Sequence, residues 1–383
     1  MSHAPQDAPY LLIGANVRFL AGNAVRHGHA IQIVDYYGDW DTRRLAPTRS
    51  LKRERVGAPS LGALVDLAEG IANKGVIYGP GFENDLAALA RLAPLGRVLG
   101  CGMESVRNAR NPVALARAAG TWNLRYPPVA FRRSESLAPG RWLAKPYHGM
   151  GGAGVLDLAD PAAAGATQVF YQKFVPGMAS SAAILSDGSS ATVVAVFTQI
   201  VGDPDFGASG FRFVGNVYPH PFADEMGKRV TDMAEALTLE FDLKGLWGFD
   251  FVYDGEVNLI EINPRPSSSL GVLGAATLTD LVALHVGGST GDTSRLYLDA
   301  APAGTYTAQA RVFARAEGVF SCAQNWARRG ARDIPEDGEI IAAGAPILTL
   351  AAADSSYSGV IARLKEQAAE LYAGMERSTA SVA

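Results

Sequence analysis

Residues 248–265 read Gly248-Phe-Asp-Phe-Val-Tyr-Asp-Gly-Glu-Val-Asn-Leu-Ile-Glu-Ile-Asn-Pro-Arg265. Two apolar segments flank Asp254-Gly255, a dipeptide that strongly indicates a β-hairpin. A two-residue turn would set Asp250 opposite Leu259 and make Glu261 its diagonal neighbour, roughly 7–8 Å away between backbones. Because side chains alternate along strands, we expect one face of this hairpin to carry Asp250, Leu259, Glu261 and Asn263.

Two carboxylates converging on this hairpin predict a bound cation. Asp250 and Glu261 should repel each other unless a positive ion lies between them. Oxygen ligands suit a hard ion such as magnesium, or manganese, rather than zinc. The alternative is a solvated hairpin face whose acids never meet, and these residues alone leave both interpretations open.

A second motif, Lys145-Pro-Tyr-His-Gly-Met-Gly-Gly-Ala-Gly-Val155, contains the Gly-x-Gly-x-x-Gly pattern. A strand is expected to follow it, whereas a dinucleotide-binding loop opens a helix, and no Gly-Lys-Ser/Thr follows to make a P-loop. We therefore expect a strand–loop–strand flap whose backbone N–H groups meet nucleotide phosphates, with Lys145 adding a point charge. The glycines concerned are Gly149, Gly151, Gly152 and Gly154. The alternative is a flexible hairpin without a ligand.

Length and composition narrow the classes of protein. A chain of 383 residues is too long for one typical core, so we expect two or three domains. The net charge of −4 and the absence of a long basic run argue against broad nucleic-acid binding. The sequence has two cysteines, no signal-peptide pattern in its first nine residues and no apolar stretch near the ~20 residues that a membrane span needs. We therefore expect a cytoplasmic protein.

The order of predicted elements indicates an α/β unit followed by an α+β unit. Apolar segments at 10–14, 30–35, 75–79 and 97–100 alternate with helical stretches, which predicts a parallel sheet. A dinucleotide site is the rival here, but Gly14 is not followed by the required glycine spacing. Short strands dominate from 141 to 265, and the tail from 305 is expected to end in a helix near 358–374.

The glycine flap and its lysine are followed about a hundred residues later by two acids and an asparagine. This order is the pattern of a two-part ATP site, and it resembles the ATP-grasp superfamily. The resemblance implies an ATP-grasp fold of mixed α/β and α+β class. We expect a Rossmann-like pre-ATP-grasp domain at 1–110, a small lobe with the flap at 111–175, a C-lobe with the metal site at 176–295, and a C-terminal extension at 296–383 that packs on it.

The same resemblance assigns roles to individual residues, with ATP and Mg²⁺ (or Mn²⁺) as cofactors. Asp250, Glu261 and Asn263 fall where the family holds metal, Arg265 completes that motif, and Lys145 falls on the phosphate-binding lysine. The segment joining the two lobes, whose backbone meets adenine, corresponds to Gln172, Lys173 and Val175. Gln172 departs from the glutamate common there, and Ser181 lies where a polar nucleotide contact is frequent.

Three segments resemble the biotin-carboxylase-related carboligases: the opening Leu-Ile-Gly-Ala-Asn-Val-Arg, the run Val34-Asp-Tyr-Tyr-Gly-Asp-Trp-Asp41 and the segment Phe211-Arg-Phe-Val-Gly-Asn216. This branch implies a carboxylate–amine ligase that works through an acyl phosphate. Arg265 would hold the carboxylate, with Arg212 and Asn216 lining the acceptor pocket. His148, His220 and His285 are the candidates for a base.

Substrates and partners follow from the same resemblance. Small-molecule carboxylates and amines are expected, and glutamate added to a pterin- or furan-type one-carbon cofactor precursor is the specific expectation. A homodimer is left open. Two other functions are weighed: a regulatory or assembly protein that binds ATP without ligase turnover, and an NAD(P)-dependent oxidoreductase.

Overall fold

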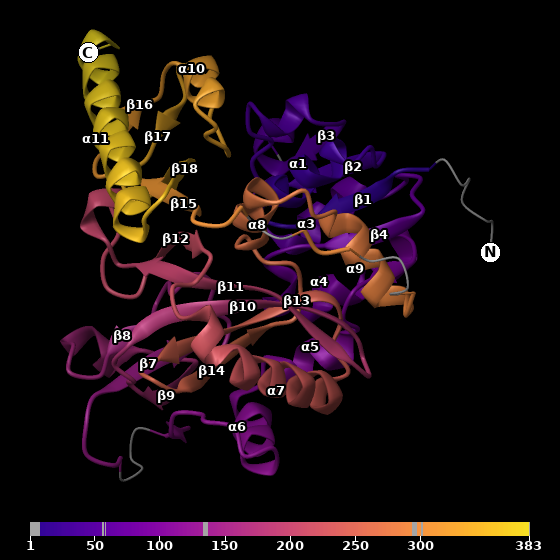
Figure 1. The fold of residues 1–383 in the computed structure, drawn as a ribbon. Helices are drawn as coiled ribbons and strands as arrows, with labels where there is room; N and C mark the ends of the chain where they lie inside the picture. The colour runs from indigo at the N-terminus through magenta and orange to yellow at the C-terminus, as the bar shows by residue number, and fades with distance from the viewer. Residues whose placement is uncertain are drawn as a thin grey trace.

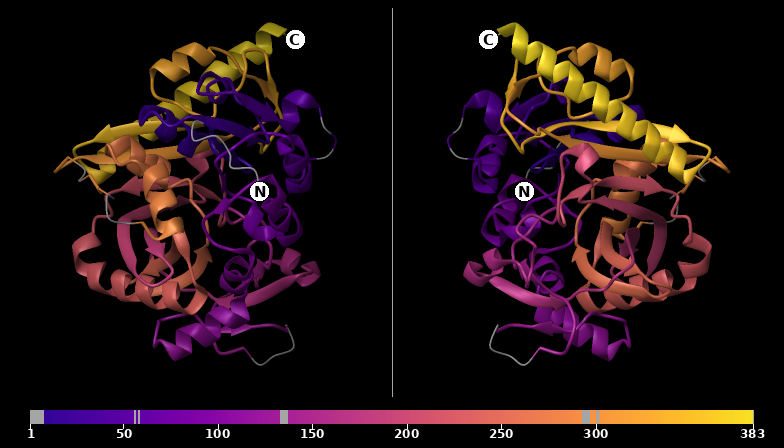
Figure 2. Two further views of the ribbon diagram at one scale, coloured as in Figure 1. Left: turned by 90° about the vertical axis from the view of Figure 1, so that its right-hand side faces the viewer. Right: turned by 90° about the vertical axis from the view of Figure 1, so that its left-hand side faces the viewer.

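The computed structural model describes residues 8–55, 57, 59–132, 137–292, 297–299 and 302–382, with side chains described as far as residue 375. Residues 1–7, the start of the segment judged not to be a signal peptide, lie outside this part. The N-terminal domain and the C-terminal part lie together at one end of the molecule (Figures 1 and 2). A small lobe lies at the other end, and a large sheet lies between them.

The N-terminal domain is the predicted parallel sheet. Its five strands lie in the order β3-β2-β1-β4-β5, and every neighbouring pair is parallel. The strands are β1 (Tyr10–Ile13), β2 (Ile31–Asp35), β3 (Thr48–Ser50), β4 (Gly75–Tyr78) and β5 (Val98–Leu99). The connecting helices are α1 (Arg18–Arg26), α2 (Leu51–Glu54), α3 (Leu61–Ala68), α4 (Leu86–Ala90) and α5 (Met103–Ala109). Parallel strands present their carboxyl ends at one edge, which is where such sheets bind ligands.

The small lobe begins with α6 (Pro112–Thr121), which Asn111 caps by accepting a hydrogen bond from the backbone N–H of Val113. Its sheet has the order β6-β9-β7-β8 and is antiparallel throughout. The strands are β6 (Val129–Ala130), β7 (Trp142–Pro146), β8 (Leu156–Asp157) and β9 (Val169–Lys173). The glycine motif is therefore a loop between two strands, as the sequence predicts.

The central sheet has seven strands in the order β14-β13-β10-β11-β12-β15-β18. Its first five members are β10 (Met178–Asp187), β11 (Ala191–Val201), β12 (Phe213–Tyr218), β13 (Lys244–Tyr253) and β14 (Val257–Asn263). Trp247, Phe249 and Phe251 alternate along β13 and share a core with α7 (Ala223–Phe241). Leu246 and Asp250, whose positions alternate with those of the aromatic residues, point to the opposite face. There Leu246 packs with α8 (Leu270–Ala276) and α9 (Leu281–Thr290). Asp250 thus lies on the face opposite α7.

The hairpin exists, but its predicted register is wrong in one respect. Tyr253 pairs with Val257, so the loop holds three residues, and Gly255 occupies it with a φ of +100°. A bulge at Ile260 then sets Asp250 directly opposite Glu261. The third loop residue, before the bulge is reached, already shifts Leu259 opposite Phe251 and so to the other face, where it is fully buried. Leu259 therefore does not join the predicted polar face, while the two acids come closer than predicted.

The C-terminal part continues the central sheet. Strand β15 (Tyr306–Phe313) pairs with β12, and β18 (Pro346–Asp354) pairs with β15. Helix α11 (Tyr357–Val382) packs on these strands (Figure 1). The other elements are β16 (Gly318–Val319), α10 (Ala323–Arg328) and β17 (Ile340–Ile341). Within the described ranges, none of the helices combines the length and apolar character that a membrane crossing requires.

Candidate functional site

The site is built around the Asp250–Glu261 pair, which the structure brings together. Asn263 Nδ2 donates to Asp250 Oδ2 at 3.3 Å, and Gln199 Nε2 donates to Asp250 Oδ1 at 3.0 Å. Burial, and next the charge of Glu261, raises the pKa of Asp250 to about 7. Burial also acts to raise the pKa of Glu261, but the cations Arg110 and Lys145 outweigh it, so that this pKa lies below its ordinary value.

The donor set fits magnesium. Across the described ranges, no three His, Cys, Asp or Glu side chains form a group that could hold a metal. Two carboxylates and an amide oxygen are thus the protein's own contribution. Mg²⁺ is commonly bound by one or two carboxylates, with waters and substrate phosphates completing its octahedron. Repulsion between Asp250 and Glu261 contributes to the raised pKa of Asp250, and a divalent ion would relieve that repulsion.

The glycine flap is held closed against two other parts of the chain. Gly151 O accepts a hydrogen bond from Phe213 N at 3.0 Å, and Gly149 O accepts from Arg110 and from Asn84, each at 3.2 Å. At Gly152, where φ is +73°, a Cβ would lie 1.8 Å from the carbonyl oxygen of Phe211. Only glycine fits there, because both the backbone conformation and the contact exclude a side chain.

Lys145 lies at the end of β7, inside the small lobe, and is 8% exposed. Its Nζ donates to Gln172 Oε1 at 3.0 Å. Burial lowers the pKa of Lys145, and Glu261 partly opposes that shift, which places the ammonium within the electrostatic reach of the acid pair. Gln172 is 2% exposed, and within the part of the chain that the structure describes its buried Nε2 has no hydrogen-bond acceptor. The side chain predicted to contact ribose or adenine therefore faces Lys145.

The remaining predicted nucleotide contacts fall at the junction of the lobes. Lys173 ends β9, and Val175 lies in the connection from β9 to β10, as the sequence predicts. Ser181 on β10 is directly opposite Asp250, and its hydroxyl accepts a hydrogen bond from Asn216 Nδ2 at 3.4 Å. Ser181 and Asn216 thus lie beside the acid pair.

Arg212 does not join this group, which corrects its assignment to the acceptor pocket. Its guanidinium lies 3.7 Å from the centre of the Phe313 ring, and Nη2 donates to Gly344 O at 2.9 Å. Both partners belong to the C-terminal part of the chain. Stacking on an aromatic ring and binding a carbonyl account for this side chain.

Arg265 is engaged by a residue from the N-terminal domain. Its Nη2 and Nε donate to Glu83 Oε1 at 2.6 and 3.0 Å, and Nη2 also donates to Asn263 Oδ1 at 3.1 Å. Both partners are almost fully buried, at 7% for Arg265 and 4% for Glu83. In this structure the guanidinium is engaged by these two side chains, and its contact with a substrate carboxylate stays a prediction. Arg265 thus joins the N-terminal domain to the acid pair.

Sequence reasoning missed Glu83, Asn84, Arg110 and Gln199. Glu83 and Asn84 follow β4, at the carboxyl edge of the parallel sheet, and that position is a usable signal for ligand-binding residues. Arg110 follows α5, and its Nη1 lies 3.4 Å from Glu261 Oε2. No local pattern distinguishes Arg110 or Gln199, since each matters only through partners distant in sequence.

The candidate bases lie outside the site or serve the fold. His220 Nε2 bonds Ser180 Oγ at 3.0 Å, and His285 Nδ1 accepts from Leu246 N at 2.9 Å. Burial lowers the pKa of both imidazoles to about 4. His148 is exposed on the flap. The two buried histidines thus act as neutral hydrogen-bonding groups of the core.

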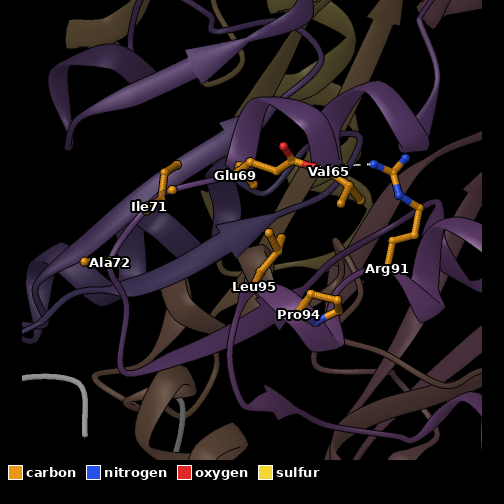
Figure 3. A pocket seen from close by; sticks show the side chains of 9 residues that line it. Val65, Glu69, Ile71, Ala72, Arg91, Pro94 and Leu95 are labelled. Atoms are coloured by element: carbon orange, nitrogen blue, oxygen red, sulfur yellow. Dashed lines mark ion pairs between the residues drawn. The ribbon is translucent and has the colours of Figure 1, made fainter. Parts of the chain in front are cut away.

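A recess of about 460 Å³ on the N-terminal domain is separate from this site (Figure 3). Its lining includes Val65, Ile71 and Leu95, and an ion pair of 3.7 Å joins Arg91 to Glu69 beside it. It contains none of the predicted functional residues.

The arrangement defines a class: a two-lobed nucleotide-binding fold with a glycine flap above paired acids. Residues 113–269 match the model of the ATP-grasp domain. This segment of the chain is therefore an ATP-grasp domain, and the predicted fold is confirmed.

Known proteins agree with this fold. A 120-residue stretch is 30% identical to the carbamoyl phosphate synthase large chain of Clostridium acetobutylicum and covers 31% of this chain but only 11% of that one. The phosphoribosylamine–glycine ligase of Thermotoga maritima superposes with a TM-score of 0.68 at 14% identity, over 94% of this chain and 96% of its own. The biotin carboxylase domain of the 2-oxoglutarate carboxylase of Hydrogenobacter thermophilus was solved with MgADP and bicarbonate. It superposes with a TM-score of 0.70 at 13% identity, over 94% of this chain and 89% of its own.

Proposed function

We propose that this protein is an ATP- and magnesium-dependent ligase that joins a carboxylate to an amine. The observation that carries the proposal is the direct opposition of Asp250 and Glu261 beneath a glycine flap and a buried lysine. The printed name of the Thermotoga relative, a ligase of phosphoribosylamine and glycine, supports the same class of reaction.

The proposed ATP site uses residues from both lobes. Backbone N–H groups of Gly149, Gly151, Gly152 and Gly154 meet the phosphates, and Lys145 supplies their positive charge. The connection containing Lys173 and Val175 offers its backbone to adenine, while Gln172 and Ser181 supply polar contacts. Magnesium, held by Asp250, Glu261 and Asn263, neutralises the charge of the phosphates when it is bound.

The proposed chemistry passes the γ-phosphoryl group to the substrate carboxylate, and the amine then displaces phosphate to give the amide. Phosphoryl transfer needs positioning and charge neutralisation more than a protein nucleophile. Arg265, fixed by Glu83 and Asn263, stabilises negative charge beside the acids. No histidine is assigned as base, since His220 and His285 are committed to the core.

The experiment that tests this proposal is product analysis by ³¹P NMR. ADP and phosphate should form only when a carboxylate and an amine are both present. AMP and pyrophosphate would contradict an acyl-phosphate route. Tight ATP binding without turnover would favour the regulatory or assembly function, and NAD(P)H binding to the N-terminal domain would favour the oxidoreductase.

Substrate identity and oligomeric state are the finer parts of the proposal. We propose glutamate as the amine, added to a pterin- or furan-type one-carbon cofactor precursor, on the resemblance of the sequence to its branch. Accumulation of the unglutamylated precursor in a deletion strain is the expected result. We also propose a homodimer, for which light scattering should give twice the chain mass of 40.3 kDa.

A further inference from the structure

The run Val34-Asp-Tyr-Tyr-Gly-Asp-Trp-Asp41 takes no part in the ATP site, yet it builds a second charged cluster. Asp35 ends β2 and is fully buried; its Oδ1 accepts from Gly38 N at 2.8 Å, whereas its Oδ2 has no hydrogen-bond partner among the described residues. Asp39 is 8% exposed, and its carboxylate has no hydrogen bond or ion pair to any described residue. A buried carboxylate oxygen without a partner is costly, so Asp35 Oδ2 points to a missing cationic partner.

The neighbouring acids are already satisfied. Asp41 binds Arg18 Nε at 2.6 Å and Ile334 N at 2.8 Å. Asp333 accepts from Asn16 at 3.0 Å and from Thr349 at 2.6 Å. These bonds hold Asp41 and Asp333 in place and leave Asp35 and Asp39 as the open acceptors of the cluster.

An open cation lies beside the same cluster. Arg311 on β15 makes no hydrogen bond or ion pair with any residue that the structure describes. Arg311 is directly opposite Thr349, whose hydroxyl donates to Asp333 at 2.6 Å, and the N–H of Trp40, next to Asp39, donates to the carbonyl of Ile334 at 2.8 Å. Arg311 and Asp39 therefore both lie beside Asp333. Burial raises the pKa of Tyr37, Arg311 opposes that shift, and Asp39, Asp333 and Asp35 add to it, which agrees with this placement. Tyr37 is 36% exposed, and the cluster therefore reaches the surface. Unpaired charges of both signs around one side chain are complementary to a zwitterion.

The cluster lies on the side of the N-terminal domain that faces the ATP site. Asp35 ends β2 and Glu83 follows β4, with only β1 between these strands, so the strand ends are roughly 10 Å apart at the same edge. Glu83 in turn binds Arg265 beside the acid pair. A small molecule seated on Asp35 and Asp39 would thus extend toward the reacting groups.

We propose that this cluster binds the amine substrate as an amino acid, with its ammonium on Asp35 and Asp39 and its carboxylate on Arg311. The inference rests on the proposed ligase function and specifies the class of its amine. A metal ion is a poorer occupant, because Arg311 would repel a cation.

The test uses the full chain with Mg²⁺ and a non-hydrolysable ATP analogue. Calorimetry should detect binding of at least one of the proteinogenic amino acids, and its α-hydroxy analogue, which lacks the ammonium, should bind at least about tenfold more weakly. Asp39→Asn and Arg311→Gln should each weaken the amino acid by about tenfold or more. Affinity for the ATP analogue should stay unchanged in both variants.

Asp232→Asn, which alters an exposed acid on α7, and Arg107→Gln on α5 are the matched controls. The inference is overturned if the hydroxy analogue binds as tightly as the amino acid, if the variants bind the amino acid like wild type, or if no amino acid binds. ATP binding and product analysis are measured separately, so each of those results would leave the ligase proposal standing. Failure of ATP binding itself would instead overturn the proposed function.

Discussion

Arg110 joins the acid pair to the glycine flap: its Nη1 lies 3.4 Å from Glu261 Oε2, and its Nη2 donates to Gly149 O at 3.2 Å. One guanidinium thus contacts the group proposed to hold metal and the loop proposed to cover phosphate. Arg110 Nε is buried and bonds none of the residues that the structure describes, so among these the side chain is held through its outer nitrogens. We infer that Arg110 couples flap position to occupancy of the acid pair.

Replacing Arg110 tests this coupling. Arg110→Gln should raise the KM for ATP by about tenfold, because the flap loses a charge-assisted contact. It should also speed proteolysis within residues 147–155. Arg107→Gln, an exposed arginine on the same helix, is the control and should change neither quantity. Wild-type KM and protease resistance in Arg110→Gln would remove Arg110 from the site.

The flap depends on glycine at position 152. In Gly152→Ala, the Cβ contact with Phe211 and a strained φ of +73°, costing about 1–3 kcal/mol, should keep the flap from its observed position. We expect the KM for ATP to rise roughly tenfold or more with a small change in Tm. Gly291→Ala has a similar φ of +77° but open space around it, so it reports the backbone strain alone. Equal effects of the two substitutions on KM would contradict the closed-flap geometry.

The Glu83–Arg265 pair should dominate stability between the N-terminal domain and the central sheet. Removing one partner of a buried ion pair costs about 3–5 kcal/mol, so Glu83→Gln should lower the free energy of unfolding by that order. Urea unfolding measures it, and Glu104→Gln, an exposed acid on α5, is the control.

Acid unfolding gives a second readout of the same pair. Burial alone would raise the pKa of Glu83, but Arg265 outweighs it and holds that pKa below its ordinary value. The pair therefore stabilises the protein above the unfolded pKa of about 4.3, and that contribution is lost as pH falls through the lower folded value. Wild type should lose more stability than Glu83→Gln in this range. Parallel curves would show that the pair contributes nothing through ionisation.

The metal-free acid pair should make magnesium binding depend on pH. The pKa of Asp250 is raised to about 7 by burial and by Glu261, so a proton competes with the metal below that pH. The apparent Kd for Mg²⁺ should rise about tenfold per pH unit below 7 and level off above it. Calorimetry from pH 5.5 to 8.5 checks the slope. An affinity that stays flat across pH 7 would separate metal binding from Asp250.

The order of elements and the acid pair could be predicted from the sequence because both rest on local patterns. Asp254-Gly255 between two apolar segments indicated the hairpin, and glycine spacing followed by a strand indicated the flap. The bulge at Ile260 could not be predicted, because nothing local marks an extra residue in the ladder. The partners of Arg265 and Gln172 were missed for a different reason: Glu83 and Lys145 reach them only after the domains and strands have packed together.

Whether Asp250 and Glu261 hold the magnesium of ATP–Mg²⁺ can be measured by titrating ATP into the protein with Mg²⁺ and with EDTA. Wild type should bind ATP at least about tenfold more tightly with Mg²⁺. Asp250→Asn and Glu261→Gln should lose most of that difference while keeping their weaker, metal-free affinity, and Asp232→Asn should behave as wild type. If both acid-pair variants retain the full magnesium-dependent gain, the metal lies elsewhere and the account is wrong.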